Sequence, residues 1–115
     1  MRLRVRQRSI PLWAGLALAL TLAVSGCAGS DEGLFGEELF AKNCAVCHGL
    51  GGEGSVGRPP LNAGSESATL TDEQIKGVIA VGPGAMPSFT QLTDEQVDSL
   101  VTHLRQLQGT TDDGG

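Results

Sequence analysis

Two cysteines and a histidine stand together in the segment Cys44-Ala45-Val46-Cys47-His48. On a helix, positions i and i+3 share a face, so the two thiols can reach two vinyl groups of one porphyrin and form thioethers. His48 comes next in the chain and can donate an imidazole nitrogen to the iron. C-x-x-C-H is the attachment signature of c-type haem. We therefore expect one covalent haem c, held by Cys44 and Cys47, with His48 as an axial ligand of the iron.

A C-x-x-C pair has three other common uses. A thioredoxin-like redox pair belongs where a strand meets a helix, and no strand is predicted near Cys44. A zinc site needs further Cys or His ligands, and His103 is the one candidate left unassigned. A disulfide between positions i and i+3 of a helix would be strained. The sequence favours haem attachment over all three.

The second axial ligand is predicted to be Met86. It is the one methionine beyond residue 26, and it lies in Gly82-Pro83-Gly84-Ala85-Met86-Pro87, a segment typical of a constrained loop. The alternative is a methionine that fills a gap in the core, but the two prolines restrict where its sulfur points. His103 could replace Met86 as the ligand. At about 100° per residue, however, it falls on the flank of the last predicted helix, which is typical of a packing or surface residue.

The first 26 residues are typical of a secretory signal. A basic region (1–9) precedes an uncharged run of 15 residues (10–24), and small residues follow up to Cys27. That run is shorter than the roughly 20 residues of a membrane-spanning helix. Val24-Ser25-Gly26-Cys27 resembles the bacterial lipobox, whose cysteine receives a diacylglycerol and becomes the new N-terminus. We expect export and lipid anchoring at Cys27, with the domain facing the periplasm or the cell exterior. The alternative is an ordinary cleaved signal that leaves Cys27 as a free thiol.

The composition limits which partners the chain can bind. Its 115 residues suffice for one domain and carry a formal charge of −5. Without residues 1–26, four basic residues remain against all 13 acidic ones, which gives a charge of −9. So acidic a domain is a poor binder of nucleic acid and is suited to redox proteins with basic docking surfaces. Three Phe are its whole aromatic complement, so the core is thin unless a porphyrin fills it.

Helical spacing and capping signals place the expected elements. A first helix is predicted from about residue 32 to 46, followed by a glycine-rich loop (49–57) and an extended exit at Arg58-Pro59-Pro60-Leu61. Two more helices are predicted to begin at Thr71 and Thr93, because each Thr is followed three residues later by Gln, which completes a capping box.

The second and third predicted helices each show one apolar face. The first of the two ends before Gly82 and buries Ile75, Val78 and Ile79; the last ends at Gly109 and carries a stripe of Val97, Leu100, Val101, Leu104 and Leu107. No strand is predicted. The expected organisation is a signal peptide (1–26), a short membrane tether (27–33), a haem domain (34–108) and a disordered tail (109–115).

Together, three stretches resemble the small monohaem cytochrome c family across about residues 33–108. They are Gly36-x-x-Leu39-Phe40-x-x-Asn43-Cys44-x-x-Cys47-His48-Gly49, then Arg58-Pro59-Pro60-Leu61, then Gly84-Ala85-Met86-Pro87 with a closing amphipathic helix. The resemblance implies an all-α cytochrome c fold, with three to four helices wrapped around one covalently attached haem. It also implies that the Pro59 carbonyl, or that of Pro60, accepts a hydrogen bond from the proximal imidazole. In such proteins an aromatic of the last helix packs on a Gly and an aromatic of the first, here Gly36 and Phe40; His103 stands in its place.

A haem with both axial positions filled has no open site for a substrate, which favours electron transfer over catalysis. The sequence therefore predicts a monomeric, membrane-anchored carrier of single electrons and not an enzyme. One alternative is a cytochrome subunit fixed to a larger dehydrogenase or oxidase. Others are a haem sensor in which Met86 leaves the iron for a gas, and a structural lipoprotein without haem.

Overall fold

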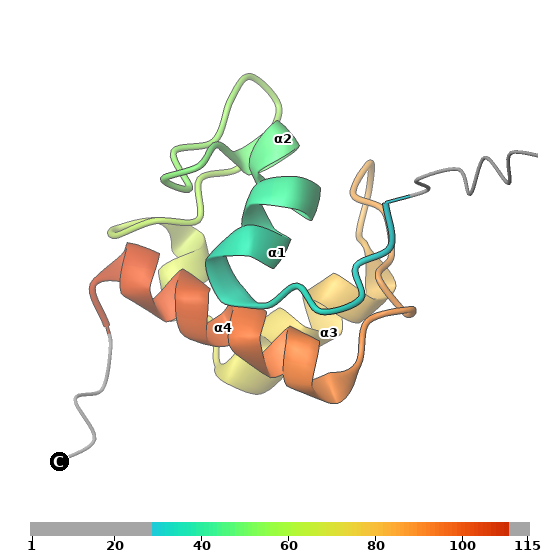
Figure 1. The fold of residues 1–115 in the computed structure, drawn as a ribbon. Coiled ribbons are helices and arrows are strands. Elements are labelled where there is room, and N and C mark those ends of the chain that lie inside the picture. The colour runs from blue at the N-terminus through green and yellow to red at the C-terminus, as the bar shows by residue number, and fades with distance from the viewer. Residues whose placement is uncertain (1–28, 111–115) are drawn as a thin grey trace, which may run out of the picture.

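Helices make up the regular structure of residues 29–110, the part of the chain that the computed structural model describes (Figure 1). In order they are α1 (Gly36–Asn43), α2 (Ala45–His48), the 3₁₀ helix η1 (Glu66–Thr69), α3 (Asp72–Val81) and α4 (Asp94–Gln108). Within these residues the extended pairing is limited to one isolated bridge between Ser55 and Arg58. The predicted all-α class is confirmed. The predicted signal peptide, the lipidation site Cys27 and residues 111–115 of the predicted tail lie outside the described residues.

The first predicted helix is two helices with different bounds. Phe35 is extended and offers no side-chain cap, so α1 begins at Gly36 and not near residue 32. Cys44 lies between α1 and α2 with φ −107° and ψ −42°, just outside regular helical geometry. The hydrogen bonds nevertheless continue through it: the Cys44 N–H donates to the Phe40 carbonyl at 2.8 Å, and the His48 N–H donates to the Cys44 carbonyl at 2.9 Å. The pentapeptide thus follows a helical course with one interruption.

The predicted ends of the two later helices are confirmed. Thr71 accepts from the Gln74 N–H and Thr93 from the Gln96 N–H, and each Gln side chain returns a bond to the backbone of its Thr. Both capping boxes satisfy amides that the first turn leaves unpaired. Gly82 and Gly109 close the helices in the left-handed conformation.

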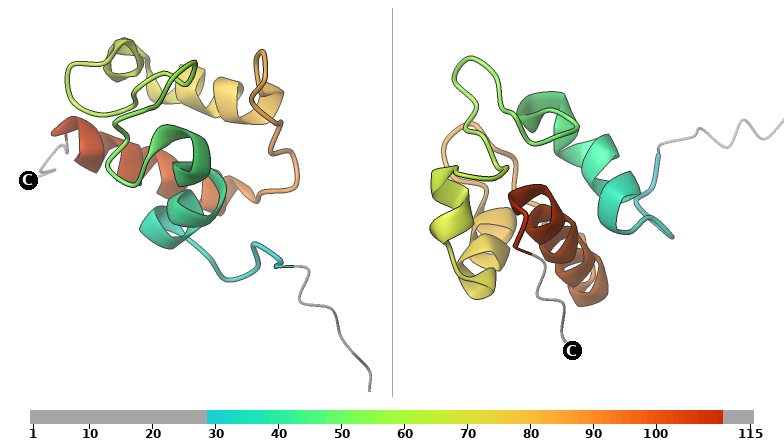
Figure 2. Two further views of the ribbon diagram at one scale, coloured as in Figure 1. Left: turned by 90° about the horizontal axis from the view of Figure 1, so that it is seen from above. Right: turned by 90° about the vertical axis from the view of Figure 1, so that its left-hand side faces the viewer.

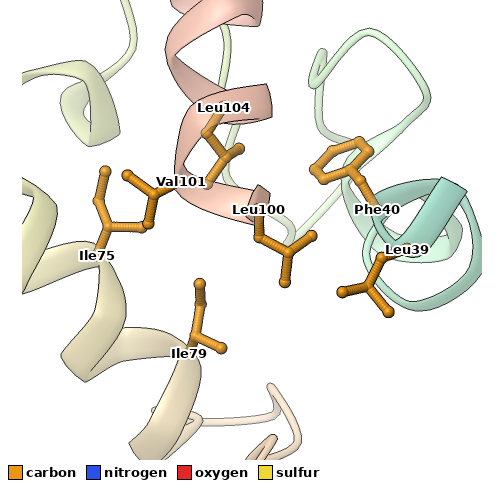
Figure 3. Packing of buried hydrophobic residues seen from close by; sticks show 7 residues of the cluster. All are labelled: Leu39, Phe40, Ile75, Ile79, Leu100, Val101 and Leu104. Carbon is orange, nitrogen blue, oxygen red and sulfur yellow. The ribbon is translucent and has the colours of Figure 1, made fainter. Parts of the chain in front are cut away.

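The core lies where α4 packs against both α1 and α3 (Figures 1 and 2). In Figure 3, Leu100 points toward α1, and Val101 lies toward Ile75 of α3. The buried apolar residues are Leu39, Phe40, Ile75, Ile79, Leu100, Val101 and Leu104. Val97 and Leu107 are partly buried against this cluster. The predicted burial of Val78 is wrong: the residue is 37% exposed, because it faces the cavity described below.

The contact between α1 and α4 is made by small and polar groups as well as apolar ones. The Gly36 N–H donates to Ser99 Oγ at 2.9 Å. Phe40 packs on His103 with ring centroids 5.0 Å apart and planes inclined by 53°. His103 therefore takes the place of the aromatic that the resemblance implies. It is only 8% exposed, and its Nε2 has no hydrogen-bond partner within the described part of the chain.

Residues 29–34 lie against the helices, although residues 27–33 were predicted as a tether. We call residues 29–34 the docked segment. Side chains at the end of α1 and the start of α4 hold it, chiefly Lys42, Asn43 and Gln96. Among residues 29–110, no helix has the length and apolar character that crossing a membrane requires.

Replacing His103 with Phe should stabilise the protein. The ring that packs on Phe40 is kept, while a buried nitrogen without a partner is removed; such a group costs about 1–3 kcal/mol. We expect the free energy of unfolding, measured in urea, to rise by about 1 kcal/mol. His103→Ala is the control, since it also removes the ring and should destabilise. A His103→Phe variant no more stable than the parent would contradict the assignment of Nε2 as unsatisfied.

Candidate functional site

A cavity of about 530 Å³ lies between the helices and the two long loops. Four residues predicted as site residues line it: Cys44, His48, Pro59 and Met86. Cys47 is half-buried and is not among the lining residues. Most of the wall is apolar and comes from α1, α3, α4 and the segment before α3, through Phe40, Leu61, Leu70, Ile75, Val78, Ile79, Leu100 and Leu104.

The orientation of His48 is set by a backbone carbonyl. Its Nδ1 lies 2.8 Å from the Pro59 oxygen, and Pro59 rather than Pro60 makes this contact. A carbonyl oxygen can only accept, so Nδ1 donates and carries the hydrogen. The neutral ring then has its lone pair on Nε2, the atom left to bind a metal. The contact spans 11 residues, so it joins α2 to the far side of the glycine-rich loop.

Gly54 allows the loop to return close enough for this contact. Its φ is +76°, in the left-handed region, and its N–H donates to the His48 carbonyl at 2.7 Å. A Cβ at this position would lie 2.7 Å from the Arg58 oxygen and 3.0 Å from the Pro59 carbonyl carbon. A side chain at residue 54 would therefore displace the carbonyl that holds His48.

The two cysteines of the described chain are free thiols. Burial raises the pKa of the Cys44 thiol to about 11, and the negative charges of Asp31 and Cys47 contribute in the same direction. Cys44 is therefore neutral near pH 7 and behaves as a small apolar group in the cavity wall. This differs from the lowered pKa that activates a thioredoxin-type cysteine. Residues 29–110 also contain no group of three or more His, Cys, Asp and Glu side chains that could hold a zinc ion.

Met86 lies in the loop between α3 and α4, half-buried and facing the cavity. The loop is closed by two backbone bonds: the Met86 N–H donates to the Pro83 carbonyl at 3.2 Å, and the Phe89 N–H donates to the Ile79 carbonyl at 3.0 Å. At Gly82, which has a φ of +63°, a Cβ would collide with the Pro87 backbone. These contacts restrict the position of the Met86 sulfur.

The residues present fit a haem c. Thiol, imidazole and thioether groups converge on an apolar cavity whose volume lies in the usual range for small-molecule sites, about 300–1,000 Å³. The unprotonated Nε2 of His48 suits an axial ligand. His103 does not line the cavity and is engaged in the contact between α1 and α4. The geometry therefore favours Met86 over His103 as the partner of His48 across the cavity.

Comparison with known proteins shows the family to which the chain belongs. The family described as "Cytochrome C oxidase, cbb3-type, subunit III" matches residues 33–104, more than half of the chain. The chain is a c-type cytochrome domain. Its fold is that of cytochrome c, as predicted, and the family implies a c-type haem. It is an electron-transfer protein and not an enzyme.

Individual relatives differ in length. Cytochrome c6 of Leptolyngbya boryana is 36% identical, with 60% of this chain and 85% of that protein covered. The cbb3-type oxidase subunit CcoP of Rubrivivax gelatinosus is 38% identical over 64% of this chain, which spans only 25% of that subunit. Among solved structures, the c-type cytochrome KustC0563 has a TM-score of 0.55 and 28% identity, with 67% of this chain and 98% of that chain covered.

Sequence reasoning missed the polar residues that fix the cavity wall of the cytochrome. Gln108 is buried; its Nε2 donates to the Leu61 carbonyl at 3.1 Å, and its Oε1 accepts from Arg105 at 2.7 Å. Arg105 also donates to the Leu70 carbonyl at 2.7 Å. These bonds tie the segments on either side of η1 to the end of α4. A long polar residue beside an apolar stripe gives no signal of such partners in the sequence.

Gly54→Ala should change the redox potential of the cytochrome, and Gly64→Ala should not. Both glycines have positive φ, but a Cβ at Gly64 meets nothing within 4 Å and Gly64 does not line the cavity, so that variant reports backbone strain alone. Displacing Pro59 weakens the hydrogen bond from His48, which makes the imidazole a poorer donor to Fe(III). Redox titration should show a higher midpoint potential for Gly54→Ala. Equal shifts in the two variants would contradict the role given to Gly54.

Proposed function

We propose that the cytochrome is a lipid-anchored carrier of single electrons outside the cytoplasm. Cys44 and Cys47 hold one haem c, and His48 and Met86 supply the two axial ligands. The observation that carries this proposal is the convergence of Cys44, His48 and Met86 on one apolar cavity. Met86 is 38 residues beyond His48 in the chain, and only the fold brings the two to a common site.

The chain's own groups explain why electron transfer is the favoured chemistry. When bound, the haem supplies a one-electron iron couple. With His48 and Met86 as its two axial ligands, the iron would have no position left for a substrate. The Met86 thioether is a soft, weak donor that favours Fe(II), and the apolar wall keeps water from the metal. Both effects raise the midpoint potential relative to a site with two imidazoles.

Membrane attachment and the choice of partners are part of the proposal. The signal-like residues 1–26 and the lipobox-like sequence support a diacylglycerol on Cys27. The charge of −9 that remains supports basic docking surfaces on the redox partners. The protein would act as a monomer that exchanges electrons at a membrane surface.

A second candidate is a subunit fixed to a larger oxidase or dehydrogenase. The likeness to CcoP favours it, since there a matching region is part of a longer oxidase subunit. Purification after mild solubilisation separates the two candidates. A carrier should be recovered alone, and a subunit should be recovered with a catalytic protein in a fixed ratio.

The absorption spectrum of the exported protein tests the site. We expect the sharp reduced bands of a c-type haem and the weak far-red band of Met bound to Fe(III). Met86→Ala should abolish the far-red band and lower the midpoint potential, because a soft ligand is lost. His103→Ala is the control and should keep the band. A band that survives in Met86→Ala would remove Met86 from the site, and covalent haem in a Cys44→Ala/Cys47→Ala chain would contradict the attachment.

Electrostatic docking predicts a rate that depends on salt. Reduction by a basic redox protein should slow by on the order of tenfold between low and high ionic strength, because salt screens the acidic surface. Stopped-flow mixing measures the rate. Reduction by a small uncharged reductant is the control and should change little. A rate with the basic protein that ignores salt would contradict docking by charge.

A further inference from the structure

The docked segment is held by side chains from two helices. Lys42 Nζ donates to the carbonyls of Gly29 at 2.6 Å and Ser30 at 2.8 Å, and forms an ion pair with Asp31 at 2.9 Å. Asn43 Nδ2 donates to the Asp31 carboxylate at 2.9 Å. These bonds to Asn43 and Lys42 lower the pKa of Asp31, so its charge is kept well below neutral pH. The end of α1 thus fixes the first described residues of the chain.

Gln96 makes the remaining contacts from α4. Its Nε2 donates to the Asp31 carbonyl at 2.6 Å and to the Leu34 carbonyl at 3.2 Å, while its Oε1 accepts the Thr93 N–H at 3.0 Å. The side chain is buried, with 6% exposure. One amide therefore completes the cap of α4 and holds a segment more than 60 residues away in sequence.

The segment lies beside the cavity. Asp31 accepts a hydrogen bond from Asn43, the residue directly before Cys44, and Cys44 forms part of the cavity wall. The segment also shares a surface groove with Gln91 and Thr93, at the end of the loop that carries Met86. In Figure 1 it is the cyan stretch that approaches α1.

The reach of the anchor follows from the chain length. Only Ala28 separates Gly29 from Cys27, so the two Cα atoms lie at most about 7 Å apart. If residues 29–35 were free, the distance from Cys27 to the start of α1 could extend to about 32 Å. The contacts of Lys42, Asn43 and Gln96 hold residues 29–34 against the helices, so the free length of chain between Cys27 and the folded domain is the shorter of these two distances.

We propose that the docked segment and the C-terminal end of α1 form the membrane-facing surface of the domain, seated directly on the bilayer. This rests on the proposed lipidation of Cys27. Of the two acids in the docked segment, Asp31 is compensated by Lys42, and Glu32 is exposed without an ion pair in the described residues. Glu37 and Glu38 lie in the first turn of α1, at the other end of that helix. The Cys44 side of the cavity is therefore held near the membrane. A redox partner suited to this orientation of the domain is a protein whose electron-exchanging group lies at the surface of the same membrane.

The two capping boxes offer a matched pair of variants. Gln74 of α3 makes the same cap as Gln96 but is exposed and has no contact with the docked segment in the described structure. Glu can replace Gln in a capping box, so Gln74→Glu should be neutral. Gln96→Glu keeps the cap but removes the amide donor and places a carboxylate against two carbonyls. Combined with Lys42→Met, it should release the segment.

The experiment measures energy transfer from headgroup-labelled lipid to the haem, with the full-length lipoprotein in phosphatidylcholine vesicles. Transfer should be equal in the parent and in Gln74→Glu. It should be lower in a chain with ten Gly/Ser residues inserted after Ala28, which adds on the order of 17 Å of reach. Gln96→Glu/Lys42→Met should fall to the level of the insertion, and its amides at residues 31–36 should exchange with deuterium faster than those of Gln74→Glu.

Energy transfer that is unchanged by the insertion would overturn the inference. Unchanged transfer in the double variant would also overturn it, once faster exchange shows that the segment is released. Exchange at residues 31–36 that stays slow in the double variant would also overturn it, since Lys42 and Gln96 would not be the groups that hold the segment. Vesicle flotation reports separately on the anchor. A parent protein that does not float, or a Cys27→Ser variant that does, would refute the proposed lipidation, whatever the exchange rates show.

Discussion

The hydrogen bond from His48 to the Pro59 carbonyl is the contact on which the site depends. It fixes the tautomer of the imidazole, and so decides which nitrogen is free for a metal. It also determines how the glycine-rich loop must run, because the chain has to leave α2 and return to His48 within 11 residues. Gly54 makes that return sterically possible. The Pro59 carbonyl thus links the conformation of the glycine-rich loop to the orientation and tautomer of His48.

The rest of the fold positions the opposite wall of the cavity. Leu100 and Leu104 belong both to the buried cluster and to the cavity lining, so α4 is shared between core and site. Arg105 and Gln108, on the same helix, donate hydrogen bonds to the backbone carbonyls of Leu70 and Leu61, which lie on either side of η1. A domain with few large side chains gains rigidity from these polar contacts, which also pair the carbonyls of Leu61 and Leu70.

Features with local causes were predictable from the sequence. The starts of α3 and α4 follow from capping boxes and their ends from glycine, and neither depends on distant residues. The haem-binding pentapeptide and Met86 carry chemistry in their residue types. The interruption at Cys44, the burial of His103 and the exposure of Val78 depend instead on what each residue meets in three dimensions. Val78 shows this most simply: an apolar residue at a core spacing faces the cavity, and periodicity does not distinguish a core from a cavity wall.

The two Leu-Thr-Asp-Glu-Gln segments show that the same local sequence can make different tertiary contacts within one chain. Both form the same cap, with donor and acceptor distances that agree within 0.1 Å. Yet Gln74 is exposed, whereas Gln96 is buried and binds the docked segment. Local sequence determines the oxygen that caps the helix, and tertiary structure determines what the amide nitrogen binds. Because a capping Gln has a donor left over, the start of α4 can hold a second part of the chain without losing its cap.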